Sequence, residues 1–151
     1  MFVGGFAILA IEKWKPAPTI TSFDSITPLN AFAIGVCQSI AMIPGVSRSG
    51  ATIMGALLLG VERKTATEFS FFLAIPTMFA ATIYDVFKHR SELTMDGVTL
   101  IAVGFAVAFV SAMVVVKWLV GFISRHGFGV FAWYRIIVGG GILAALIVRH
   151  L

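Results

Sequence analysis

The chain has 151 residues, of which 59% are hydrophobic and only 12% charged, and its mean hydropathy is +1.00. A soluble domain of this size carries about 25% charged residues, so the composition excludes an ordinary soluble domain and predicts an integral membrane protein. The net charge of +4 resides in short connections rather than on a basic face interleaved with aromatic residues, which argues against nucleic acid as a partner.

The first apolar segment, residues 1–11, is short. It reaches only about 16 Å as a helix, roughly half of the hydrocarbon thickness of a bilayer, and residues 12–16 (EKWKP) end it. It lacks the basic leader and the small-residue cleavage site of a signal peptide. We therefore expect it to be the second half of a membrane helix in a protein that continues upstream.

Residues 30–43 and 51–61 are two further short apolar segments, which meet at a polar break. The first covers about 21 Å as a helix, so neither segment crosses a bilayer alone. Two arrangements are possible. The segments form one spanning helix with a kink, or they form a re-entrant hairpin over about residues 29–61 that enters and leaves the membrane on the same face.

The positive charges favour the hairpin. In that arrangement most of the charged connections share one side, with Lys13, Lys15, Arg63, Lys64, Lys117 and Arg125. A single kinked span would instead place Lys13 and Arg63 on opposite faces. Because cytoplasmic loops are enriched in lysine and arginine, we expect the hairpin, with this side in the cytoplasm.

Residues 65–86, 98–120 and 130–148 are the approximate limits of three predicted transmembrane helices, since about 20 apolar residues cross a bilayer. Two ionisable residues, Glu68 and Arg135, lie near helix ends. They either pair with each other or serve a site, and we expect the structural pair. The predicted fold is an all-α membrane protein, a single membrane domain over residues 1–151.

The polar break at residues 44–52 (PGVSRSGAT) is the candidate site. An arginine at bilayer depth costs on the order of 2.5–3.5 kcal/mol, and irregular backbone persists there only when it is buried in protein or lines a wet cavity. We expect a half-helix from Ala51, with Ser47 or Ser49 accepting a hydrogen bond from one of its first amides. The other amides and the helix dipole would then form an anion pocket.

Individual residues of the break suit a phosphate-bearing ligand. Gly50 lets the backbone approach a ligand closely, and Gly45 permits the turn before it. Arg48 offers a planar fork for two phosphate oxygens, and Thr52 adds a hydroxyl on the same face. A structural kink with an interfacial arginine is the alternative. These residues by themselves indicate a ligand that carries phosphate, but not which ligand.

Residues 35–38 (GVCQ) and 41–53 (AMIPGVSRSGATI), followed by residues 68–71 (EFSF) and Pro76, closely resemble the undecaprenyl-pyrophosphate phosphatases, bacterial membrane enzymes also known for bacitracin resistance. The resemblance runs from Val3 to about Ala144 and covers the C-terminal half or so of the family's length. It implies a fold of two inverted repeats, each with a re-entrant hairpin, of which this chain is one half. It also implies hydrolysis of the C55 lipid pyrophosphate to the monophosphate, on the periplasmic face of the inner membrane, for peptidoglycan synthesis.

The resemblance assigns roles within the break. Arg48 matches the pyrophosphate-binding arginine and is expected to be catalytic together with Ser47 and Thr52. The residues expected to bind the pyrophosphate are Ser49, Gly50, Gly45 and Gln38. Gln38, on the first arm of the hairpin, either faces the cavity or bonds to another helix.

The chain departs from the family's pattern in the metal ligands. The family's other hairpin carries two glutamates four residues apart and a serine-rich turn ending in histidine, and no metal ligand in this chain matches them. We expect a divalent cation, Mg²⁺ or Ca²⁺, to be held by carboxylates of an absent N-terminal half, encoded separately or missing. A homodimer would imitate the inverted repeat but still lack the glutamates.

The predicted function is therefore undecaprenyl-pyrophosphate phosphatase in a truncated form, without independent activity. Two alternatives remain. The first is a transporter or lipid-flipping module, because broken hairpins with a central arginine also suit an anion carrier. The second is a non-catalytic binder of a phosphorylated lipid.

Overall fold

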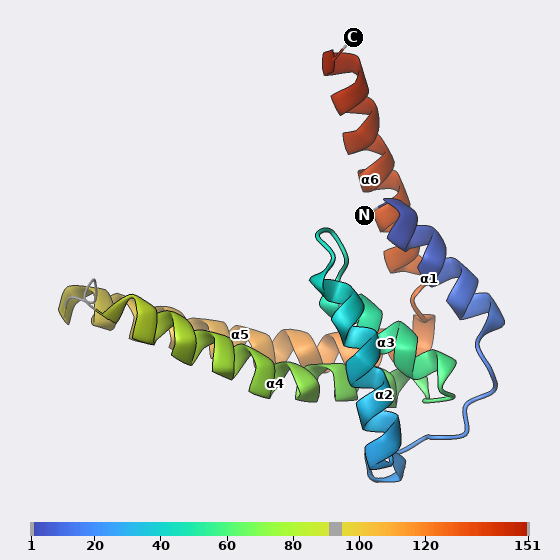
Figure 1. Ribbon diagram of the computed structural model, residues 1–151, viewed down its shortest axis with the longest axis horizontal. Helices are drawn as coiled ribbons and strands as arrows, with labels where there is room; N and C mark the ends of the chain where they lie inside the picture. Colours follow the sequence, from blue (N-terminus) through green and yellow to red (C-terminus); the bar gives the residue numbers. More distant parts are fainter. Residues whose placement is uncertain (1, 91–94, 151) are drawn as a thin grey trace.

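The structure, a computed structural model, describes residues 2–90 and 95–150, and this part of the chain is built mainly from helices (Figure 1). The helices are α1 (Phe2–Trp14), α2 (Pro28–Ser39), α3 (Arg48–Leu58), α4 (Arg63–Lys88), α5 (Met95–His126) and α6 (Gly129–His150), with short 3-10 turns η1 (Phe23–Ser25) and η2 (Ile40–Met42) in the connections. Helices α4, α5 and α6 are long and apolar enough to cross a membrane. The chain is thus an all-α membrane protein, and each long helix extends beyond the range predicted for it.

Helices α2 and α3 form a hairpin. Thr27 Oγ1 accepts a hydrogen bond from the amide of Asn30 at 3.2 Å and so caps the start of α2. After η2 the chain reverses through Gly45, whose φ of +88° lies in the left-handed region that favours glycine. The two arms pack closely, because a Cβ on Gly55 would lie 2.6 Å from the Cβ of Cys37. Of the two arrangements that the sequence allowed, the single spanning helix with a kink is therefore wrong.

The short helix α3 is the innermost element. Its residues from Thr52 to Leu57 are buried, and helices α1, α2 and α4 contact it. Ala56 and Leu57 belong to the apolar core, together with Ile34 of α2 and Ala66 of α4. Burial of this apolar surface stabilises the fold by about 25 cal/mol per Å². Because neighbours hold α3 on several sides, its N-terminus occupies a defined place.

The connection between α1 and α2 is anchored to the turn that follows α3. The amides of Thr19 and Ile20 donate to the carbonyl of Gly60 at 2.8 and 3.1 Å, and the amide of Glu62 donates to the carbonyl of Ile20 at 2.8 Å. Gly60 has a φ of +78°, in the left-handed region that favours glycine. A Cβ added to Gly60 would lie 2.9 Å from Thr19 Oγ1, so a larger residue would also crowd this contact. These bonds hold the end of α3 that lies opposite the polar break.

The long helices face outward. In the apolar, membrane-length stretches of α4, α5 and α6, only 6%, 0% and 11% of the residues are buried within the protein. Figure 1 shows α4 (green) and α5 (yellow to orange) side by side, and α6 (red) running with α1 in another direction. Apolar surface of this extent is a contact area for lipid or protein, in keeping with the membrane class.

An ion-pair cluster joins α1 to α4 and lies close to the turn between α5 and α6. Glu12 Oε1 accepts hydrogen bonds from Arg63 Nε at 2.6 Å and from Lys15 Nζ at 3.1 Å. A Cβ on Gly127 would lie 2.9 Å from the same oxygen. The cluster gathers Lys15 and Arg63, which the charge pattern assigned to one side, at one end of the helix assembly.

Candidate anion-binding site

The candidate site is the N-terminus of α3. The helix begins at Arg48 rather than at Ala51 as predicted, because Ser47 adopts the extended cap conformation and its Oγ accepts the amide of Gly50 at 3.2 Å. The carbonyl of Ser47 accepts the amide of Ala51 at 2.9 Å, and Ser49 Oγ lies 3.2 Å from Ser47 Oγ. The amides of Arg48 and Ser49 precede the first intrahelical bond. Together with the helix dipole they favour a bound anion.

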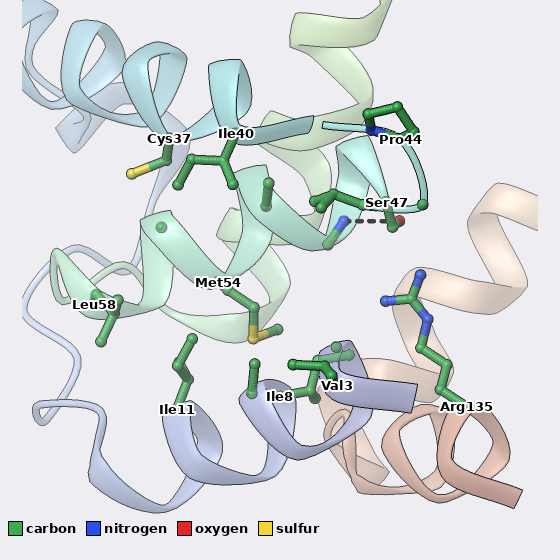
Figure 2. Close-up of a pocket in the computed structure, with 17 residues that line it drawn as sticks. Val3, Ile8, Ile11, Cys37, Ile40, Pro44, Ser47, Met54, Leu58 and Arg135 are labelled. Carbon is green, nitrogen blue, oxygen red and sulfur yellow. Dashed lines mark hydrogen bonds between the residues drawn. The ribbon is translucent and has the colours of Figure 1, made fainter. Parts of the chain in front are cut away.

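Two cavities flank this helix start. The first, of about 460 Å³, lies between α1, the α2–α3 hairpin and α6 (Figure 2). The second, of about 420 Å³, lies between α3 and helices α4, α5 and α6. Ser47, Gly50 and Arg135 line both cavities. The remaining walls are largely apolar, with Ile11, Ile40 and Leu58 in the first cavity and Phe71, Leu119 and Phe128 in the second. A small polar centre therefore joins two apolar spaces.

Arg135 is the cation of this polar centre. Figure 2 shows its guanidinium extending from α6 toward the Ser47 end of the first cavity. A Cβ on Gly4 or Gly50 would lie 3.6 or 3.5 Å from Arg135 Nη1, so the guanidinium lies between α1 and α3. Within residues 2–90 and 95–150, Arg135 has neither a hydrogen bond nor an ion pair from its side chain.

The predicted pair between Glu68 and Arg135 is wrong. Glu68 Oε1 lies 3.9 Å from Lys64 Nζ instead. The two residues of this pair are four positions apart on α4 and share one face of the helix, whereas Arg135 is turned toward α3. Arg135 thus lines the cavities, whereas the sequence had led us to expect it in a structural ion pair. The signal that singled out Arg48, the cost of an arginine in an apolar segment, applies equally to Arg135.

The side chain of Arg48 is bonded to α4. Its Nη1 donates to Thr77 Oγ1 on α4 at 2.7 Å, and its side chain lines neither space. Arg48 and Arg135 therefore have different neighbours, since Arg48 is bonded to α4 and Arg135 lines the cavities.

The other predicted residues divide into two groups. Gly45 lines the first cavity and Ser49 the second. Thr52 is 1% exposed, and its Oγ1 donates to the carbonyl of Arg48 at 2.7 Å, so the hydroxyl faces the interior and does not reach the cavities. Gln38 is half-buried and lines neither cavity, although its neighbour Cys37 lines the first.

The site does not fit a divalent cation. The part of the chain that the structure describes contains no group of three or more His, Cys, Asp or Glu side chains that would hold a metal. No described residue that lines the two cavities carries a carboxylate, and Glu12 is engaged by Lys15 and Arg63. Mg²⁺ and Ca²⁺ require oxygen ligands, carboxylates above all. The donors gathered here suit an anion.

The fold and the site define a class, an all-α membrane protein in which a capped helix start lies between two largely apolar cavities. The model of the bacitracin resistance protein BacA family matches residues 1–141. The chain belongs to this family, as the resemblance in its sequence indicated.

Among known proteins, the chain is 59% identical over 143 residues to the undecaprenyl-diphosphatase of Sphingopyxis alaskensis, a match that covers 95% of this chain and 54% of that protein. It is 53% identical over 149 residues to the undecaprenyl-diphosphatase of Rhizorhabdus wittichii, with 99% and 56% covered. It is also 53% identical over 150 residues to undecaprenyl-diphosphatase 2 of Paramagnetospirillum magneticum, with 99% and 57% covered. The chain spans about half the length of these curated relatives.

Proposed function

We propose that this chain binds the diphosphate group of undecaprenyl diphosphate and takes part in its hydrolysis to the monophosphate and phosphate. The observation that carries the proposal is the junction of Ser47, Gly50 and Arg135 between two apolar cavities. The names of the relatives support the same substrate and reaction. In this reaction the oxygen of a water molecule bonds to the terminal phosphorus while the bond from that phosphorus to the bridging oxygen breaks. The bridging oxygen stays on the lipid monophosphate, and the protons of the water are shared between the two products and the solvent.

The diphosphate lies at the N-terminus of α3 in this proposal. The amides of Arg48 and Ser49 donate to its oxygens, and Arg135 offers a planar fork from α6. Donors that are fixed in place before the reaction also stabilise the charge redistributed during phosphoryl transfer. The amides and the guanidinium of Arg135 thus supply binding and electrostatic stabilisation.

The apolar cavities suit the polyprenyl chain next to the diphosphate. An apolar cavity of about 150 Å³ holds a benzene molecule. The first cavity is about 460 Å³, so it accommodates roughly three groups of that size, or the first few isoprenyl units. The rest of the chain would follow the outward-facing apolar helices into the membrane.

Hydrolysis in this proposal needs groups from outside this chain. A divalent cation, Mg²⁺ or Ca²⁺, would be held by carboxylates that a separate N-terminal half or a second subunit brings to the site. The charge pattern supports a multi-pass protein of the bacterial inner membrane, with the Glu12 cluster in the cytoplasm. The site would then open toward the periplasm.

A second candidate function is binding or transport of a phosphorylated lipid without hydrolysis. It is favoured by the composition of the cavity walls, whose described residues include neither a carboxylate nor a histidine. Such groups are the usual general acids and bases in hydrolysis.

The test measures both the binding of undecaprenyl diphosphate and, with Mg²⁺, phosphate release from it, using the purified chain alone and with the N-terminal half of a relative added. We expect release only with the added half, and its loss in Arg135→Ala but not in Arg125→Ala, which removes an exposed arginine outside the cavities. Binding without release under both conditions would favour the second candidate. Neither binding nor release would contradict both.

A further inference from the structure

Thr77 joins α4 to the first residue of α3 through the side chain of Arg48. Arg48 Nη1 donates to Thr77 Oγ1 at 2.7 Å, and the two residues are 29 positions apart in the chain. Thr77 is half-buried, whereas Ile75, Pro76 and Met78 around it are exposed. It is thus a polar group on the inner side of a helix that is otherwise largely turned to the outside.

The spacing of α4 explains why Thr77 faces Arg48. Ala66 and Phe69 are buried in the core, and Leu73 packs against it. Thr77 follows Leu73 by four positions, so it lies on the same face one turn further along. Here an apolar stripe ends in a hydroxyl beside the N-terminus of α3.

The direction of the hydrogen bond is determined by the donors and acceptors present. A guanidinium only donates, while a hydroxyl has one proton and two lone pairs. Thr77 Oγ1 lies 3.0 Å from the carbonyl of Ala74 and 3.2 Å from that of Leu73, and its proton goes to these acceptors. Its lone pairs are left for Arg48, so the hydroxyl accepts from the guanidinium and donates to the helix backbone.

We infer that Thr77 is a positioning residue for Arg48. A free arginine side chain samples many rotamers, and this bond holds one guanidinium edge against α4 at the α3 N-terminus. Arg135 is thereby left as the cavity-lining arginine, and the positive charge of Arg48 is held in one orientation near the α3 N-terminus, outside the cavity walls. The consequence for diphosphate binding rests on the proposed function, whereas the restraint on Arg48 does not.

The first measurement observes the rotation of the Arg48 guanidinium directly. The full chain, labelled with [¹⁵N]arginine in detergent micelles, is observed by NMR, and the Arg48 signals are assigned by their loss in Arg48→Lys. We expect slow rotation and separate Nη signals for Arg48 in the wild type and in Thr77→Ser, and averaged signals in Thr77→Val. The matched control is Thr82→Val, because Thr82 also donates to the carbonyl four residues earlier on α4, at 2.9 Å, but is exposed.

The second measurement is the affinity of the same four proteins for farnesyl diphosphate by calorimetry. We expect about tenfold weaker binding in Thr77→Val, with Thr77→Ser and Thr82→Val unchanged; hydrogen bonds that involve an ionised group support an effect of this order. Circular dichroism checks that each variant is folded.

Separate Nη signals and unchanged affinity in Thr77→Val would overturn the inference. Equal losses in Thr77→Ser and Thr77→Val would also overturn it, because they would show that the shape of the side chain matters rather than its hydroxyl. If no form binds farnesyl diphosphate, the proposed function fails, while the Nη signals still decide whether Thr77 holds Arg48.

Discussion

Gly55 of α3 lies directly against Cys37 of α2, so that an added Cβ on Gly55 would be 2.6 Å from the Cβ and 2.7 Å from the Sγ of Cys37. This contact sets the distance between the two arms of the hairpin. It therefore also fixes the place of the α3 N-terminus relative to α2.

Gly55→Ala is expected to destabilise the protein by about 1–3 kcal/mol, the usual cost of overpacking a close contact. The double variant Gly55→Ala with Cys37→Gly should recover part of the loss, because it removes the clashing side chain. Gly35→Ala on α2 is the control, since an added Cβ there meets nothing within 4 Å. Thermal unfolding in detergent measures all three. An unchanged midpoint for Gly55→Ala would show that the arms are free to separate.

Arg135→Ala is expected to weaken farnesyl diphosphate binding by roughly 10- to 100-fold, because hydrogen bonds to a charged group contribute about 1.5–3 kcal/mol. Arg135→Lys should recover only part of the affinity, since an ammonium lacks the planar fork. Calorimetry on the purified chain measures both, with Arg125→Ala as the matched arginine control. Equal affinity in Arg135→Ala and wild type would remove Arg135 from the site.

Ser47→Ala is expected to destabilise α3 by about 1 kcal/mol, because the amide of Gly50 loses its side-chain acceptor. Ser49→Ala should have a smaller effect, since its hydroxyl bonds to Ser47 Oγ, whereas the Gly50 amide donates to Ser47. Chemical unfolding in detergent compares the two variants. A larger loss in Ser49→Ala would mean that the cap has been assigned to the wrong serine.

Glu12→Gln tests the ion-pair cluster that ties α1 to α4. Glu12 is 16% exposed, but Arg63 is 40% exposed, so solvent screens the pair and the expected loss is only about 1 kcal/mol. Glu68→Gln is the control, because its contact with Lys64 is long, exposed and within one helix, and its loss should be close to zero. Thermal unfolding measures both variants, and equal losses would show that the cluster adds nothing specific.

Much of the architecture follows from local sequence. Stretches of about 20 apolar residues predict membrane-length helices, and the Pro-Gly break between two short apolar segments, read with the charge pattern, predicts the hairpin. The capping role of Ser47 or Ser49 is equally local, because it depends on residues within one turn. The family was recognisable for the same reason, since its motif is a continuous run around Arg48.

The directions of the side chains were decided by tertiary structure. Arg48 bonds to Thr77 on α4, and Arg135 of α6 lies beside Gly50 of α3 instead of pairing with Glu68. The physical reason is that side-chain direction depends on the rotation of each helix about its axis. That rotation is set by contacts between residues far apart in the chain. The sequence by itself determined the class of protein, its helices and its polar break, and only the packing around α3 decided which arginine lines the cavities.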